Sequence, residues 1–286
     1  MSGSGRIGRG WQLAKQSWAV LRADRSLMLF PVVAAFAIVA TALLIAGPGV
    51  VLLATDTAAP VAFVLWAVAL FLFTYIGVYC SVALAAAANL ALDGRDTTLS
   101  DGFSVAKARR GLIAKWALVQ LTVGLILNLI EAALSQSPLG RVVASLIAGV
   151  LSAGWSIVTF FVVPLLALEG TPPKEALQRS GSLIKQRWGE GFVGAGSITG
   201  IFFLAIMLPG ILIGALGVSM IGASPAAGGA LLAIGVAIFV GGALVSSTLN
   251  AIFRVALLRY ATSDEVVAGF ERDQMEHAFR PRRGRF

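Results

Sequence analysis

The chain has 286 residues, of which 58% are hydrophobic and only 13% are charged. An average soluble domain is about one-quarter charged, so the composition excludes an ordinary water-soluble domain and predicts an integral membrane protein. We expect the formal net charge of +8 to reflect basic residues beside anionic lipid and not nucleic-acid binding, because in membrane proteins the placement of Lys and Arg matters more than their sum.

Six apolar runs are each long enough to cross about 30 Å of hydrocarbon as an α-helix. They lack the two-residue alternation of barrel strands, and only helices or closed barrels satisfy their backbone groups in lipid. The predicted fold class is therefore all-α: a polytopic transmembrane helical bundle with six spans in one membrane domain, residues 1–260, followed by a cytoplasmic basic tail, 261–286. The spans are expected at about 27–54, 61–92, 112–134, 142–168, 192–221 and 226–258.

The connectors between the runs alternate between short and long. If the N-terminus, the long connectors 93–111 and 169–190 and the C-terminus share one side, that side holds 21 of the 22 Lys and Arg residues, with Arg141 opposite. Cytoplasmic flanks are enriched in Lys and Arg. Both termini are therefore predicted to be cytoplasmic.

A segment that mixes basic and apolar residues precedes each pair of spans. These segments are predicted to form interfacial amphipathic helices at about 8–25, 99–111 and 172–190. Their similarity raises the hypothesis of a threefold helix-plus-hairpin repeat, with amphipathic composition alone as the alternative explanation.

The third of these segments has the clearest helical pattern. Leu177, Gly181, Ile184 and Trp188 share one face at helical spacing, which is typical of a helix with its apolar side in the acyl boundary and its basic side toward anionic headgroups. Thr171 and Pro172 are expected to start this helix. In the second segment, Thr98 and Asp101 have the spacing of a capping box.

The sequence predicts no catalytic, cofactor-binding or metal site. The only histidine, His277, lies in the polar tail, so one chain cannot build a His-based triad or an H-E-x-x-H zinc site. We therefore expect no enzyme activity and no cofactor. The single cysteine, Cys80, lies in an apolar run and is expected to be a small buried side chain.

Ionisable residues inside spans are functional candidates because a charge in hydrocarbon is costly. Glu131, with Asn128 about one turn earlier, forms a candidate intramembrane polar site near the outer end of the third span. The alternative is an acid that reaches the outer headgroups or is capped by a neighbouring helix. Arg254 and Asn250 lie near the inner end of the last span, where we interpret Arg254 as an interface anchor, with a gate as the alternative.

Pro164 and Pro209 interrupt the fourth and fifth spans and are expected to kink them. A substrate site at the broken helix is the alternative. The fifth span also contains two G-x-x-x-G patterns, Gly196 to Gly200 and Gly210 to Gly214. Such spacing favours close helix packing, although it also arises by chance in Gly-rich membrane sequences.

Glu169 lies in the stretch LEGTPP, at the C-terminal end of the fourth span. An acid at this position opposes the helix dipole, so we predict that it pairs with a basic side chain. Arg179, Lys185 or a residue of another cytoplasmic helix is the candidate partner. Glu169, Arg179 and Lys185 therefore form a candidate structural latch between a spanning helix and a surface helix.

Three stretches together resemble an uncharacterised family of bacterial, mainly actinobacterial, six-span membrane proteins that is catalogued as a domain of unknown function. They are WQLAKQSWAVLRADRSLMLFP at the start, FFVVPLLALEGTPPKEALQRSGSLIKQRWGE in the middle and IFRVALLRYATSDEVVAGF at the end. The middle stretch is also similar to the membrane domain of glycerophosphodiester phosphodiesterases, but no metal-binding barrel accompanies it, so that activity is not carried over. The resemblance implies a multi-pass protein of the bacterial plasma (inner) membrane.

The function expected from the sequence is a non-catalytic membrane module that organises lipid or a partner protein. Its expected partners are membrane lipids, with anionic headgroups at the cytoplasmic face, and either another protein or a second copy of the chain. The alternative is a transporter or permease for a lipid or small solute, with Pro209, Glu131 and Asn128 near its path.

Overall fold

The computed structural model describes residues 16–55, 58–135, 138–187 and 203–265, and every regular element among them is helical. Residues 16–23 are helical and lead into the 3-10 turn η1 (Arg25–Met28). The elements that follow are α2 (Leu29–Thr41), η2 (Ala42–Ala46), α3 (Gly47–Ala54), α4 (Ala59–Leu92), α5 (Leu99–Ala108), α6 (Arg110–Leu134), α7 (Pro138–Val158), α8 (Val162–Leu168), α9 (Pro173–Arg187), η4 (Phe203–Met207), α11 (Leu208–Met220) and α12 (Pro225–Ser263). The all-helical prediction is confirmed for these residues.

Five helical stretches are long and apolar enough to cross a membrane: Arg25–Ala54, Ala59–Leu92, Arg110–Leu134, Gly140–Leu168 and Pro225–Ser263. Each begins within two residues of a predicted span. The predicted fifth span, 192–221, is seen only as η4 and the shorter apolar helix α11, because its first part lies outside the described residues. The multi-pass helical architecture is thus supported by five candidate spans, while six spans and the threefold repeat stay predictions.

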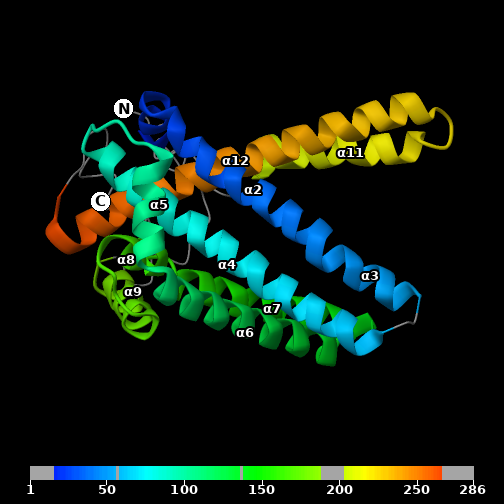
Figure 1. Cartoon of the computed structure of the whole chain (residues 1–286), viewed down its shortest axis with the longest axis horizontal. Helices are drawn as coiled ribbons and strands as arrows, with labels where there is room; N and C mark the ends of the chain where they lie inside the picture. Colours follow the sequence, from blue (N-terminus) through cyan, green and yellow to red (C-terminus); the bar gives the residue numbers. More distant parts are fainter. Residues whose placement is uncertain (1–15, 56–57, 136–137, 188–202, 266–286) are drawn as a thin grey trace, which may run out of the picture.

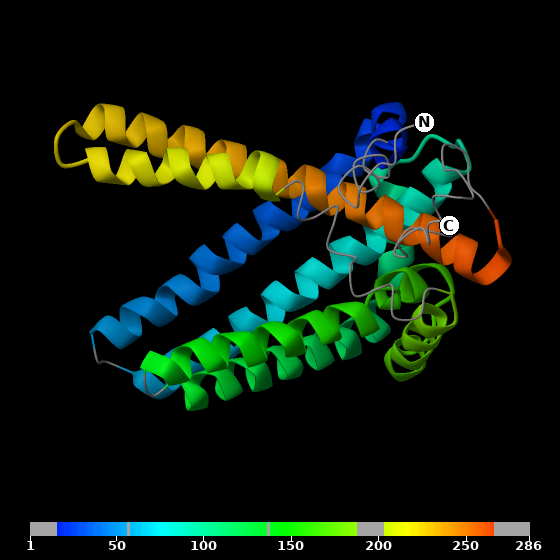
Figure 2. The ribbon, with the colours of Figure 1, turned by 180° about the vertical axis from the view of Figure 1, so that it is seen from behind.

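The long helices converge at one end of the molecule and diverge at the other (Figures 1 and 2). We call the end that carries α5, α9 and the C-terminus of α12 the basic end. All segments predicted to be cytoplasmic and described by the structure lie there, whereas the C-terminal ends of α3, α6 and α11 lie at the far ends of the divergent helices (Figure 1). The α11–α12 hairpin stands apart from the group formed by α4, α6 and α7, with α2 and α3 between them.

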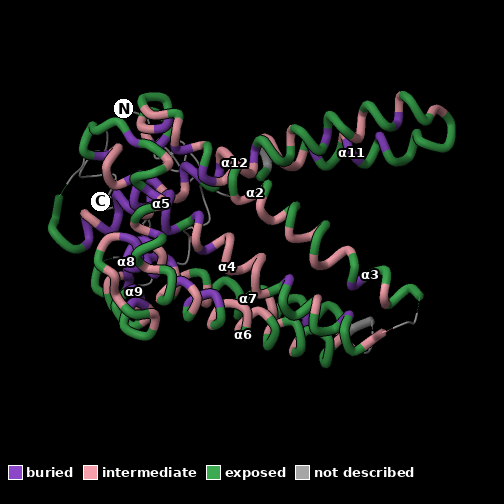
Figure 3. The backbone as a smooth tube through the Cα atoms, in the orientation of Figure 1, coloured by how far each residue is buried: buried purple, intermediate pink, exposed green. Residues whose placement is uncertain are grey.

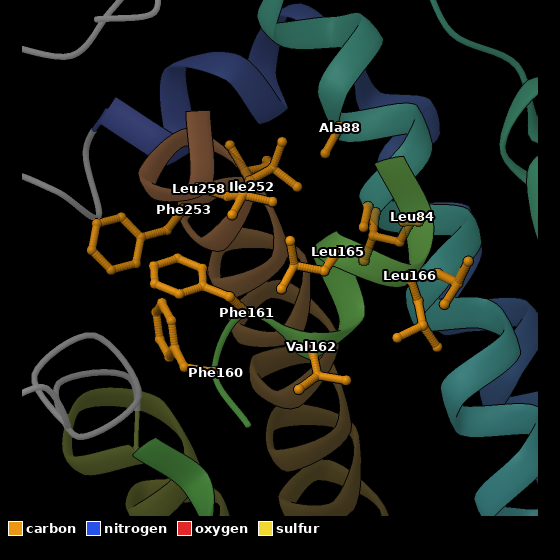
Figure 4. Close-up of a cluster of buried hydrophobic side chains, with 14 of the residues drawn as sticks. Leu84, Ala88, Phe160, Phe161, Val162, Leu165, Leu166, Ile252, Phe253 and Leu258 are labelled. Atoms are coloured by element: carbon orange, nitrogen blue, oxygen red, sulfur yellow. The ribbon is translucent and has the colours of Figure 1, made fainter. Parts of the chain in front are cut away.

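The buried core lies at the basic end (Figure 3). Figure 4 shows side chains of α4, of the segment around α8 and of α12 packed together there, with Leu84, Leu165 and Ile252 among them. Along the divergent helices, by contrast, large apolar side chains such as Phe36 and Val150 are exposed. This distribution suits helices that pack on one another at the basic end and meet lipid elsewhere.

Prolines account for the interruptions in these helices. Pro164 cannot donate a backbone hydrogen bond, and regular helix is lost between Val158 and Val162. The buried N–H of Phe161 donates instead to Ser180 Oγ at 3.0 Å. The π-helical turn η4 lies directly before Pro209, so the interruptions expected at Pro164 and Pro209 are both present.

The surface helices agree with the sequence only in part. The capping box of Thr98 and Asp101 is present at the start of α5. The prediction that Thr171 caps the next surface helix is wrong, because Ala176 N–H donates to Pro172 O and the Thr171 hydroxyl lies 3.4 Å from a Glu169 carboxylate oxygen.

Helix α9 buries the face that the sequence indicated, but buries it against protein. Ser180 and Ile184 are buried, Ser180 bonds the Phe161 N–H, and Gly181 lies beside Val158 at the end of α7. Ile184 therefore does not lie in the acyl boundary as expected, whereas Leu177 and Gly181 of the same face are half-buried and Trp188 lies outside the described residues. The break before α8 explains the difference, because it leaves an amide that Ser180 satisfies.

Asp24 joins the N-terminal segment to the connector between α4 and α5. Its carboxylate accepts hydrogen bonds from the backbone N–H groups of Ser26, at 2.9 Å, and Thr97, at 3.0 Å. Burial opposes ionisation of Asp24, but the hydrogen bonds from Ser26 and Thr97 together outweigh it and hold the pKa of this carboxyl below its usual value.

Helices α11 and α12 pack through facing glycines. Gly210, Gly214 and Gly217 of α11 are buried, as are Gly228 and Gly235 of α12. A Cβ placed on Gly235 would lie 2.6 Å from Gly210 O and 2.7 Å from Gly214 Cα, closer than real Cβ contacts. The close packing predicted for Gly210 and Gly214 is confirmed; Gly196 and Gly200 lie outside the described residues.

Candidate functional site

A cavity of about 460 Å³ lies at the basic end, where α2, α4, α8 and α12 meet. Its volume falls within the usual range for small-molecule sites. Most of its wall is apolar, with contributions from α2 (Pro31, Ala34), α4 (Leu84, Ala85), α8 (Val163, Pro164), η4 (Met207) and α12 (Ala243, Ala251). We call it the α12 cavity.

Polar side chains enter the α12 cavity chiefly from one face of α12. Ser246, Asn250 and Arg254 are spaced four residues apart, so they stack along one side of the helix. Asn250 Nδ2 donates to Ser246 O at 2.8 Å, which shows how the smaller polar groups are satisfied by their own helix. On the facing helix, Ser81 Oγ likewise donates to Gly77 O at 2.7 Å.

Arg254 differs from these groups because no described residue of the cavity lining balances its charge. The guanidinium carbon lies 4.9 Å from the centroid of the Phe160 ring, a cation–π contact. The Nε atom is buried and has no hydrogen-bond partner among the described residues. None of the described residues that line the cavity is acidic. The described lining of the α12 cavity is therefore largely apolar, with Arg254 as its one cation.

The sequence had singled out Arg254 and Asn250, with Arg254 interpreted as an interface anchor and a gate as the alternative. The structure places Arg254 half-buried at the cavity wall, and the helices that enclose it are far apart in sequence. Sequence reasoning missed the cavity because the crossing of α2, α4, α8 and α12 leaves no local signal.

A second cavity, of about 490 Å³, lies between α2, α4 and α5. The rings of Tyr75, Tyr79 and Phe103 follow one another along it, with centroids 5.8 and 5.9 Å apart. Lys107 and Arg110 are exposed residues of its lining. Cys80 borders both cavities and is a buried free thiol, as predicted.

Glu131 and Asn128 are not brought to either cavity. Both are exposed on α6, and Asn128 Nδ2 donates to Gly124 O of its own helix at 2.8 Å. They lie toward the end of α6 that is remote from the basic end. The arrangement fits an acid near the outer headgroups, and a polar intramembrane site at these residues stays a prediction.

Glu169 forms an ion pair with Arg179. Arg179 is one of the candidate partners proposed from the sequence, which also included Lys185 and a residue of another cytoplasmic helix; Lys185 is exposed further along α9. Glu169 is the C-cap residue of α8 and Arg179 belongs to α9, so the pair joins the two elements of the proposed latch. The latch role itself stays a prediction.

Arg109 also contacts the C-terminal end of α8, and the sequence did not predict this contact. Its guanidinium donates to the backbone carbonyls of Leu166 and Leu168, the latter at 3.2 Å. A cation at the C-terminus complements the dipole of α8 and satisfies carbonyls that lack helical partners. The only sequence signal was an uncapped helix end, which does not select Arg109 from the many neighbouring basic residues.

The described residues contain no group of three or more His, Cys, Asp and Glu side chains arranged to hold a metal ion. The chemistry of the α12 cavity is instead that of a fixed positive charge, short polar side chains and an apolar wall. Such a site can bind and orient an amphipathic anion.

A family model matches residues 59–269, from the start of α4 to beyond the end of α12. The chain belongs to this family of unknown function, DUF6159. Of the elements around the α12 cavity, only α2 lies outside the DUF6159 match. No curated protein and no solved structure matches the chain. The family match supports the expected relation to an uncharacterised family, whereas bacterial origin and similarity to the phosphodiesterase membrane domain stay predictions.

Proposed function

We propose that this DUF6159 protein is a non-catalytic membrane protein that binds and organises lipid through the α12 cavity. The observation that carries the proposal is the position of this largely apolar cavity where the long helices begin to diverge. On α2 and α12, the exposed side chains Phe36 and Val240 lie two and three residues beyond Ala34 and Ala243. Acyl chains would therefore contact apolar protein both inside and outside the cavity, gaining about 0.8 kcal/mol per buried CH₂.

The proposal includes a six-span topology in a bacterial plasma (inner) membrane with both termini in the cytoplasm. It is supported by the concentration of Lys and Arg at the basic end and by the packing of α11 along α12. Residues 192–221 would form the fifth span. In this topology the α12 cavity lies at the inner leaflet, and α5 and α9 lie beside the inner headgroups.

A binding role fits the lining better than a catalytic one. The hydroxyls of Ser81 and Ser247 donate to carbonyls of their own helices at 2.7 and 2.8 Å, so neither is paired with a base that would activate it. Arg254 remains protonated at any physiological pH. The site therefore offers a fixed charge and not a group that exchanges protons.

A lipid transporter is the second candidate, because interrupted helices border the cavity. Pro164 and Met207, the last residue of the π-turn before Pro209, both line it. Broken helices at membrane depth are typical of transporter binding sites. A transport path would then begin at the α12 cavity and not at Glu131 and Asn128.

Photocrosslinking tests the binding role. The protein is reconstituted in vesicles that contain a phospholipid with a photoactivatable acyl chain, and the labelled residues are mapped by mass spectrometry. We expect labels on cavity residues such as Ala34 and Ser247, and their loss when Ala34→Phe and Ala243→Phe fill the space. Ala237→Phe, on the exposed face of α12, is the matched control and should leave the labelling unchanged.

Failure to label the cavity in the native protein, or equal labelling in the filled variant, would refute lipid binding there. Scrambling of a fluorescent lipid between leaflets, abolished by the same filling substitutions, would favour the transporter.

A further inference from the structure

We infer that the ligand of the α12 cavity is an anionic phospholipid and that Arg254 binds its phosphate. The inference rests on the proposed lipid-binding function and specifies its ligand. Neither the family match nor the sequence alone assigns a ligand to this residue.

The charge of Arg254 favours an anionic ligand. A guanidinium held in apolar surroundings without a counter-ion is unfavourable, because the charge loses its hydration and gains no partner. Within the described chain, Arg254 has the Phe160 ring on one side and no carboxylate in the cavity. Arg179 and Arg259 show the contrast, since each is paired with an acid. A bound anion would supply the missing partner of Arg254.

The position of Arg254 along α12 matches the depth of the inner lipid headgroups. The part of α12 from Pro225 to Phe253 contains no ionisable side chain, and at 1.5 Å per residue it is about 43 Å long. A bilayer measures about 40–45 Å with its headgroup regions included. If α12 enters at the outer surface, Arg254 lies at the level of the inner headgroups, where lipid phosphates are.

The shapes of the guanidinium and of the cavity also fit a phospholipid. The planar guanidinium fork matches phosphate oxygens, and the apolar walls of the cavity match the glycerol backbone and the first acyl methylenes. Asn250 and Ser246 follow along the same wall. A zwitterionic lipid would bring an ammonium group into a cavity whose described lining has no acid, so a lipid with net negative charge is favoured.

The test compares two photoactivatable lipids in phosphatidylcholine vesicles: phosphatidylglycerol and phosphatidylcholine with identical acyl chains. Phosphatidylglycerol should label the α12 cavity more strongly. Arg254→Met should lower that labelling about tenfold, the size expected for loss of a charge-assisted hydrogen bond, while labelling by phosphatidylcholine changes little. Arg254→Lys, which keeps the charge but not the fork, should retain part of the preference. Arg110→Met, an exposed residue of the second cavity, is the control for general surface charge.

A second measurement, of heat stability, distinguishes loss of lipid binding in Arg254→Met from misfolding of the variant. In lipid-free micelles, Arg254→Met should be at least as heat-stable as the native protein, because it removes an unpaired charge. Added phosphatidylglycerol should raise the melting temperature of the native protein but not of Arg254→Met. An equal rise in both would contradict the inference.

The remaining outcomes separate the inference from the proposed function. Equal labelling by both lipids, unchanged in Arg254→Met, would overturn the phosphate contact and leave lipid binding intact. No cavity labelling by either lipid would overturn both. Loss of labelling on adding inorganic phosphate would assign the site to free phosphate and overturn the lipid assignment.

Discussion

Gly235 lies at the crossing of α11 and α12, where the two backbones are in contact. A Cβ at this position would be 2.6 Å from Gly210 O and closer still to Gly214 N, whereas ordinary contacts begin at 3.4 Å, so Gly235→Ala requires the helices to separate by at least about 0.8 Å. The obstructing atoms, Gly210 O and the N and Cα of Gly214, are all backbone atoms, which cannot move aside by a side-chain rotation. The hairpin itself must therefore open.

The energetic effect follows from the size of that gap. A separation of this size forfeits roughly a quarter to a half of each dispersion contact along the seam, and overpacking of this kind typically costs about 1–3 kcal/mol. The higher helix propensity of Ala returns about 0.5–1 kcal/mol. We expect a net destabilisation of about 1–2 kcal/mol.

Gly241→Ala is the matched control. Gly241 is an exposed residue of the same helix, and a Cβ there meets nothing within 4 Å. Reversible unfolding in mixed detergent micelles, followed by circular dichroism, should show Gly235→Ala destabilised and Gly241→Ala unchanged or slightly stabilised. Equal unfolding free energies for the two variants would refute the close packing of α11 on α12 through their facing glycines.

Three further substitutions test the basic end. Arg109→Met should destabilise the fold by about 1–3 kcal/mol in the same unfolding measurement, because it leaves carbonyls of α8 unsatisfied; the exposed Arg110→Met should have little effect, and equal losses would contradict the capping role. Glu169→Gln should cost no more than about 1 kcal/mol, since exposed ion pairs are weak, and a double-mutant cycle with Arg179→Met should show a favourable coupling; zero coupling would reject the latch. The depressed pKa of Asp24 means that its carboxylate stabilises the fold above its unfolded pKa of about 3.9, and that this contribution is lost as pH falls through the lower folded value. Melting temperatures measured from pH 7 to pH 3 should therefore decline less in Asp24→Asn than in the native protein; parallel declines would show that Asp24 makes no such contribution.

Local patterns in the sequence predicted much of the fold. Continuous apolar runs gave the candidate spans to within a few residues at their starts, because a membrane helix must satisfy its own backbone. The capping box at Thr98 and the interruption before Pro164 depend only on near neighbours and were also foreseeable. The Gly210 to Gly214 spacing indicated a packing face, although not its partner on α12.

The sequence predictions that failed concerned residues whose contacts are with distant segments of the chain. Thr171 looks like a cap in isolation, but Pro172 O takes the first helical hydrogen bond and the Thr171 hydroxyl turns to Glu169. The apolar face of α9 looks lipid-facing until Ser180 meets the amide freed at Phe161. The setting of Arg254 requires α2, α4, α8 and α12 to meet around it, and no sequence spacing encodes that meeting.

The most direct test of the account is an electron cryo-microscopy structure of the protein in nanodiscs that contain phosphatidylglycerol. We predict headgroup density within hydrogen-bond distance of the Arg254 guanidinium, continued by acyl-chain density along the apolar wall of the α12 cavity. A cavity without lipid density, or an Arg254 side chain paired with a carboxylate of the protein itself, would contradict the central claim.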